Sequence, residues 1–291
     1  MQLLINVLLY GALVSLIAYA VKIFFLPTRF FNVAIAALLT LSAYLFYTFW
    51  QVIHLNVVSA IFFAVFFCCL LFVAVEKFIF RPFLNRTDSS MVPMMVSLGV
   101  YIVVQNLIPI IWDNATHVIF PGKDITAGHL IWNGYITDVQ IVCVLTCGCL
   151  MAVGSLIMNY TRIGLSIRAV SDNNYLSVIQ GISSDRTILN ATIISSVMVA
   201  FAGVLLSLEF SINPTMGFNW LLYGMVALII GGTSSEFGVV AGAFLLATLQ
   251  QLAVYYFGSQ WMDFAVYLLL ITFLAIKPLG LYGTRTKKVE I

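Results

Sequence analysis

Residues 161–186, which read TRIGLSIRAVSDNNYLSVIQGISSDR, form the longest polar passage in a chain made of long apolar runs. The passage separates two of these runs and carries three arginines against two aspartates. A membrane protein seldom keeps an ordered amphipathic helix on its cytoplasmic side unless something docks there. We therefore interpret residues 159–186 as a cytoplasmic coupling loop on which another protein pushes.

The middle of this passage has the pattern of a short capped helix. Asp172 or Asn173 can cap the free N–H groups at its start, and Gly181 fits its C-terminal stop. Its apolar side chains are Tyr175, Leu176, Val178 and Ile179. The pattern predicts an amphipathic helix with an apolar docking face.

The composition places the rest of the chain in a bilayer. Of the 291 residues, 62% are hydrophobic and only 8% are charged, whereas a soluble domain has about 25% charged residues. A surface this poor in charge cannot face water, so we expect residues 1–291 to form one all-α polytopic membrane domain. The first apolar run lacks the cleavage site of a signal peptide and is long enough to be a span.

Nine apolar segments are candidate spans, because about 20 helical residues cross the hydrocarbon layer. They are residues 3–25, 32–50, 57–75, 91–111, 138–158, 187–210, 219–230, 239–257 and 262–276. The seventh is too short to cross without help. Together with the polar residues after it, it predicts one broken or short helix near residues 219–238.

The positions of Lys and Arg predict the orientation, because cytoplasmic loops are enriched in these residues. The loops at 76–90 and 159–186 hold three each and the tail from Lys277 holds four, whereas the loops at 51–56 and 211–218 hold none. The first group is therefore expected in the cytoplasm, with the C-terminus. Alternation then places the N-terminus outside.

Residues 231–238, GGTSSEFG, interrupt two apolar runs. Lipid cannot satisfy the backbone groups of such a break, so it is either buried in protein or lines a water-filled cavity. Discontinuous helices of this kind often mark substrate sites in transporters, and a tight turn at the cytoplasmic edge is the alternative. The candidate substrate-path residues here are Gly231, Gly232, Thr233, Ser234 and Ser235.

Three other polar residues are candidates for the substrate path. Asn32, near the start of the second span, can line the path or bond a neighbouring helix. Glu209 is an intramembrane carboxylate, which is a functional candidate by default, although it can also reach the headgroups. Asn213 lies in the outer loop at 211–218.

Several chemistries have no support in the sequence. There is no G-x-x-x-x-G-K-[ST] loop, so the chain should not hydrolyse ATP itself. There is no HExxH or G-x-S-x-G motif, and we expect neither enzyme activity nor a metal or other cofactor. A proton- or sodium-driven carrier needs buried ionisable groups, and the spans offer almost none. We therefore expect the energy for transport to come from outside this chain.

A set of ordered motifs resembles those of the LivH-type permeases of branched-chain amino acid ABC importers. Glu76, Arg81 and Pro82 match the family's E-R-x-x-x-R-P, residues 161–170 match T-x-x-G-x-x-I-R-A-V, and residues 181–182 match the end of L-x-G-I. Further along the chain, residues 213–217 match N-P-x-M-G, residues 231–238 match G-G-x-G-S-x-x-G, and residues 277–283 match R-P-x-G-L-x-G. They run in order over roughly two hundred residues, and together they are specific.

Two departures fall where we would place the solute path. The family's N-F-A-H-G at the second span reads Asn32-Val33-Ala34-Ile35-Ala36 here, and the central glycine of the break is Ser234. These changes leave the expected fold and partners intact but put the substrate in doubt.

The resemblance implies a permease of the bacterial inner membrane with a second homologous permease, two cytoplasmic ATPases and an extracytoplasmic solute-binding protein as partners, and no nucleic acid. It also implies that residues 171–182 are the coupling helix, with the apolar side chains in a groove of the ATPase. The residues assigned to coupling are Arg168, Asp172, Asn173, Tyr175, Leu176, Val178, Ile179 and Gly181.

Two other readings stay open. The first keeps the architecture but changes the cargo to urea, a short amide or another small solute, and it gains weight from Ile35 in place of the family's histidine. The second is a stand-alone channel or secondary carrier. Uptake competition tests the first, and transport without ATP or partners tests the second.

Overall fold

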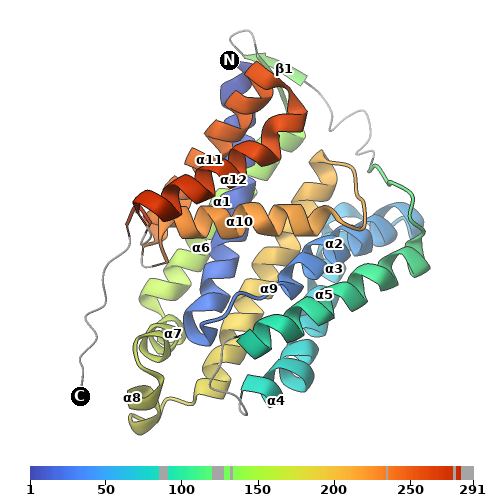
Figure 1. Ribbon diagram of the computed structural model, residues 1–291. Coiled ribbons are helices and arrows are strands. Elements are labelled where there is room, and N and C mark those ends of the chain that lie inside the picture. Colours follow the sequence, from blue (N-terminus) through green and yellow to red (C-terminus); the bar gives the residue numbers. More distant parts are fainter. Residues whose placement is uncertain (85–90, 120–127, 132–133, 234, 278–279, 283–291) are drawn as a thin grey trace.

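The computed structural model describes residues 1–84, 91–119, 128–131, 134–233, 235–277 and 280–282 (Figure 1). In these ranges, eight helical segments are long and apolar enough to cross a membrane, and one apolar helix is shorter. The predicted all-α polytopic fold is therefore confirmed, with eight candidate spans in these ranges and a short helix, α10, in the region where one was predicted. The elements are α1 (Gln2–Thr28), α2 (Ala34–Tyr47), η1 (Thr48–Val52), α3 (Val57–Val75), η2 (Glu76–Phe80), α4 (Arg81–Leu84), α5 (Met91–Trp112), β1 (Gly128–Ile131), β2 (Gly134–Thr137), α6 (Asp138–Tyr160), α7 (Arg162–Asp172), α8 (Asn174–Ile179), α9 (Ser184–Glu209), α10 (Met216–Gly231), α11 (Glu236–Phe257), η3 (Ser259–Trp261) and α12 (Met262–Ile276).

Two segments expected to be loops contain regular structure. The third span does not end at Val75 but continues through the π-helical turn η2 into α4, because Glu76 and Phe80 pack inside the protein. The segment expected to be a loop at 112–135 contains the antiparallel strand β1, whose partner β2 extends to Thr137. The second strand leads directly into α6, where Thr137 and Gln140 form a capping box.

Two helices form the centre of the bundle. In the most apolar 18-residue stretch of each helix, 72% of the residues are buried in α1 and in α9. The corresponding share is 17% in α5 and 11% in the segment Ser259–Ile276, which contains α12. α1 packs against α6, α9, α10 and α11, and α2 packs against α9 and α10. The poorly buried helices are therefore the ones that present apolar surface outward, as lipid requires.

The short helix α10 lies inside this bundle. It packs against α1, α2 and α11, and most of its residues are buried, including Trp220, Leu221 and Leu228. Its last carbonyl oxygens, on Ile230 and Gly231, accept hydrogen bonds from Leu281 N and Tyr282 N at 2.7 and 3.3 Å. These bonds satisfy groups that a helix end leaves open.

Segments with different charge lie at opposite ends of the protein. At one end Arg81 of α4 forms an ion pair with Asp185 of α9 at 2.7 Å. At the other end His117 pairs with Ile212 as an isolated bridge, and Tyr135 N donates to Gln2 Oε1 at 3.0 Å. Figure 1 shows the N-terminus beside the hairpin at one end and α8 at the other. The described parts of the basic loops at 76–90 and 159–186 thus share an end, whereas most of the basic tail lies outside the described residues.

Candidate functional site

The polar passage after α6 folds into two helices instead of the single one predicted. Thr161 caps α7 by accepting a hydrogen bond from Gly164 N at 3.3 Å. Ile167 and Val170 of α7 are buried, so α7 is fixed against the bundle. Sequence reasoning missed α7, which is the arm that carries the second helix.

The second helix, α8, has the predicted caps. Asn173, and not Asp172, is the N-cap, and its Oδ1 accepts from Leu176 N at 3.1 Å. After the helix, Gly181 has φ +85, a conformation that favours glycine and ends helices. Ser177 faces inward and is buried.

The apolar side chains of α8 face outward. Tyr175, Leu176, Val178 and Ile179 are 76%, 54%, 55% and 66% exposed, and we call them the α8 apolar face. An exposed apolar cluster at the polar end of a membrane protein is typical of a protein interface. Four of the eight predicted coupling residues thus form one surface, Asn173 and Gly181 delimit its helix, and Arg168 and Asp172 line a neighbouring cavity.

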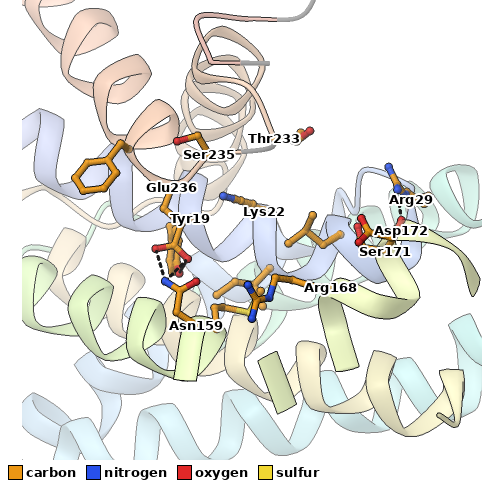
Figure 2. Close-up of a pocket in the computed structure, with 14 residues that line it drawn as sticks. Tyr19, Lys22, Arg29, Asn159, Arg168, Ser171, Asp172, Thr233, Ser235 and Glu236 are labelled. Carbon is orange, nitrogen blue, oxygen red and sulfur yellow. Dashed lines mark hydrogen bonds between the residues drawn. The ribbon is translucent and has the colours of Figure 1, made fainter. Parts of the chain in front are cut away.

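This cavity has a volume of about 690 Å³ and lies between α1, α6, α7 and the start of α11. Its charged lining residues are Lys22, Arg29, Arg168, Asp172 and Glu236, and its apolar ones include Ile23, Leu26 and Met158. Figure 2 shows these side chains entering from all four elements. The size is within the usual range for small-molecule sites.

One end of the cavity is held together by Glu236, the first residue of α11. Its carboxylate accepts hydrogen bonds from Tyr19 Oη at 3.1 Å, from Ser155 Oγ, and from Asn159 Nδ2 at 3.4 Å. The helix N-terminus also favours a negative charge at this position. Glu236 therefore ties α1, α6 and α11 together where the cavity begins (Figure 2).

Replacing Glu236 with alanine should lower the free energy of unfolding by about 1–3 kcal/mol, because Tyr19, Ser155 and Asn159 lose their acceptor. The measurement is the thermal unfolding of the purified protein in lipid nanodiscs. Glu209→Ala is the comparison, since among the described residues the Glu209 carboxylate accepts one side-chain hydrogen bond, from Gln140 at 2.7 Å. An equal or smaller loss for Glu236→Ala would contradict the role assigned to this cluster.

Lys22 lies on the α1 wall and is only 4% exposed. Its ammonium is 6.0 Å from the centre of the Tyr19 ring. Among the described residues, it has no hydrogen bond and no ion pair, the one ion pair there being Arg81–Asp185. The expectation that the spans hold almost no buried ionisable group overlooked Lys22. It was visible as the one Lys or Arg inside the predicted spans.

The break between α10 and α11 is a packing contact with a polar edge. A Cβ on Gly231 would lie 2.2 Å from Gly238 O, and one on Gly242 would lie 2.4 Å from Ala227 O. Gly231 and Gly232 are buried, whereas Thr233 and Ser235 line the cavity. Ser234 lies outside the described residues. The glycines of the break thus pack α10 on α11, and Thr233 and Ser235 border a cavity.

The other predicted substrate-path residues do not line this cavity. Asn32 is buried, its Oδ1 accepts from Ala34 N at 2.9 Å, and its Nδ2 has no partner in the described part of the chain. Glu209 pairs with Gln140 near the hairpin end. Asn213 Oδ1 accepts from Thr215 Oγ1 at 3.1 Å in the neighbouring loop. The structure therefore separates these three residues from the break.

The fold is that of a polytopic membrane protein, with a cavity of small-molecule size between its helices. The model of the branched-chain amino acid transport system / permease component family matches residues 3–275. The chain belongs to this family, whose members are transport permeases and not enzymes.

Individual relatives agree with the family. The chain is 27% identical over 214 residues to the high-affinity branched-chain amino acid permease LivH of Escherichia coli K12, covering 72% of this chain and 69% of the relative. It is 26% identical over 215 residues to BraD of Pseudomonas aeruginosa, with the same coverage. The xylose permease XylH of Haemophilus influenzae matches over 113 residues at 33% identity, or 36% of this chain and 30% of the relative.

A solved structure shares the fold. PsaBC from Streptococcus pneumoniae, in complex with Fab, aligns with a TM-score of 0.51 over 97% of this chain and 94% of that chain, at 11% identity. At this identity the likeness concerns the architecture alone.

Proposed function

We propose that this chain is the permease subunit of an ATP-driven importer whose ATPase subunits bind the α8 apolar face. The observation that carries the proposal is the exposure of Tyr175, Leu176, Val178 and Ile179 on a helix that is capped at both ends and held by α7. Because α7 is packed against the bundle and carries α8, movement of a partner bound to α8 is transmitted to the bundle through α7. Membership of the permease family supports separate ATPase subunits.

The proposed assembly contains a second, homologous permease, two ATPases and a solute-binding protein on the opposite side. The bridge between His117 and Ile212 joins the outer loops near 112–119 and 211–218 into one surface, which we assign to the solute-binding protein. In this orientation α8 and the C-terminus lie in the cytoplasm and the N-terminus lies outside the bacterial inner membrane. The sharing of one end by α4 and α8 supports it.

The proposed cargo is a branched-chain or similar amino acid, as the names of LivH and BraD suggest. The alternative cargo, urea or a short amide, rests on Ile35 and Ser234. Ile35 is fully buried among core residues and does not line the cavity, so its difference from the family's histidine lends little weight to a change of cargo. XylH adds D-xylose as a compound to include in competition.

The test is uptake of L-[³H]leucine into proteoliposomes that hold this chain with its genomically adjacent ATPase, permease and solute-binding protein. We expect uptake that requires ATP and is competed by isoleucine and valine, but not by urea, acetamide or D-xylose. An ATPase variant that cannot hydrolyse ATP is the control. Uptake of urea with no effect of leucine would overturn the cargo, and uptake by this chain alone without ATP would overturn the mechanism.

A further inference from the structure

Lys22 is buried, and it lines the cavity without forming an ion pair among the described residues. Removing a charge from water costs several kcal/mol unless the charge is paired. The carboxylate that shares its cavity, Glu236, is held by Tyr19, Ser155 and Asn159. Among the described residues, Lys22 therefore shares its cavity with a carboxylate of opposite charge but forms no ion pair with it. Lys22 is only 4% exposed.

The rest of the cavity completes a site with three kinds of surface. Arg168 lies on the wall formed by α7, across from Lys22 (Figure 2). The Asp172 carboxylate lies at the end away from Glu236 and has no hydrogen-bond partner among the described residues. Ile23, Leu26 and Met158 supply an apolar wall. The cavity thus offers a buried cation, a free anion and aliphatic contacts within one volume of about 690 Å³.

We propose that this cavity binds a free aliphatic α-amino acid on the release side of the permease, with its carboxylate at Lys22. The ammonium group of the ligand lies toward Asp172, and its side chain lies against Ile23, Leu26 and Met158. The identity of the amino acid rests on the proposed function, whereas the need for an anionic group rests on Lys22 alone. Because α7 forms one wall and carries α8, the bound ligand bridges the docking arm to α1.

The test is equilibrium binding of L-[³H]leucine to the purified full chain in lipid nanodiscs, with no ATPase or solute-binding protein present. We expect saturable binding. 4-Methylpentanoate, which lacks the ammonium group, should compete, and 3-methylbutylamine, which lacks the carboxylate, should compete at least tenfold more weakly than leucine. Equal competition by the amine, or displacement by inorganic phosphate as effective as that by leucine, would overturn the proposal. This ligand series needs no variant.

Variants locate the binding. Lys22→Met should weaken leucine binding at least tenfold and Lys22→Arg should retain most of it, while Lys77→Met, a change at an exposed lysine outside the cavity, should leave it unchanged. If Lys22→Met does not fold, Arg168→Gln on the opposite wall should weaken binding severalfold. Binding that none of these cavity changes affects would overturn the site.

The two proposals fail in different ways. ATP-dependent leucine uptake with no saturable binding, or with binding insensitive to Lys22, would remove the site and leave the proposed function. Carboxylate binding that depends on Lys22, in a chain that supports no ATP-driven uptake, would remove the proposed function and leave an anion site.

Discussion

Replacing Leu176 and Ile179 together with aspartate should abolish ATP-driven uptake and the capture of the ATPase subunits. Both side chains are more than half exposed on α8, so the change adds two charges to the surface assigned to docking. Hot-spot side chains at interfaces contribute about 2 kcal/mol or more each, so losing two corresponds to roughly a thousandfold weaker binding. The measurement is co-purification of tagged ATPase, followed by uptake.

The folded permease itself should be unaffected, because exposed substitutions usually change stability by less than about 0.5 kcal/mol. Ser183→Asp is the control, since it adds one negative charge four residues from Ile179 at the N-cap of α9, where aspartate is favoured. This variant should bind ATPase normally. Full ATPase binding and uptake by the double variant would show that α8 is not the docking element.

Gly231→Ala should destabilise the protein strongly. The added Cβ would meet Gly238 O at 2.2 Å, and a backbone oxygen held between two packed helices cannot rotate away. Overpacking of this kind costs about 1–3 kcal/mol and occasionally more, and we expect the upper end here. Thermal unfolding in nanodiscs measures it.

Gly148→Ala in α6 is its control. No atom lies within 4 Å of a Cβ at Gly148, and alanine is favoured over glycine in a helix by about 1 kcal/mol, so this variant should be neutral or slightly more stable. A Gly231→Ala protein as stable as Gly148→Ala would mean that the contact between α10 and α11 can open without loss.

The spans were predictable because the bilayer sets a length that a run of apolar residues records directly. The last apolar helix has the predicted bounds, Met262–Ile276, and the third begins at the predicted Val57 but continues past Val75. Helix α8 was predictable for a different reason: Asn173 and Gly181 act on backbone groups within a few residues of themselves. Local chemistry of this kind can be read from sequence.

The cavity could not be predicted in the same way. Tyr19 and Glu236 are 217 positions apart, and Ser155 and Glu236 are 81 apart, so no pattern in the sequence brings them together. Only packing of α1, α6 and α11 does so. Lys22 was an available signal, since a cation inside an apolar run needs a structural or functional reason, but no sequence pattern indicates which residues surround it.

The closure of α10 by residues near the end of the chain has a consequence for biosynthesis. Ile230 and Gly231 obtain their hydrogen-bond donors from Leu281 and Tyr282, which the ribosome adds only after α11 and α12. Until then, the end of α10 retains open carbonyl groups, which a membrane tolerates poorly. We therefore expect the end of α10 to acquire its final hydrogen bonds only after α11 and α12 have been made.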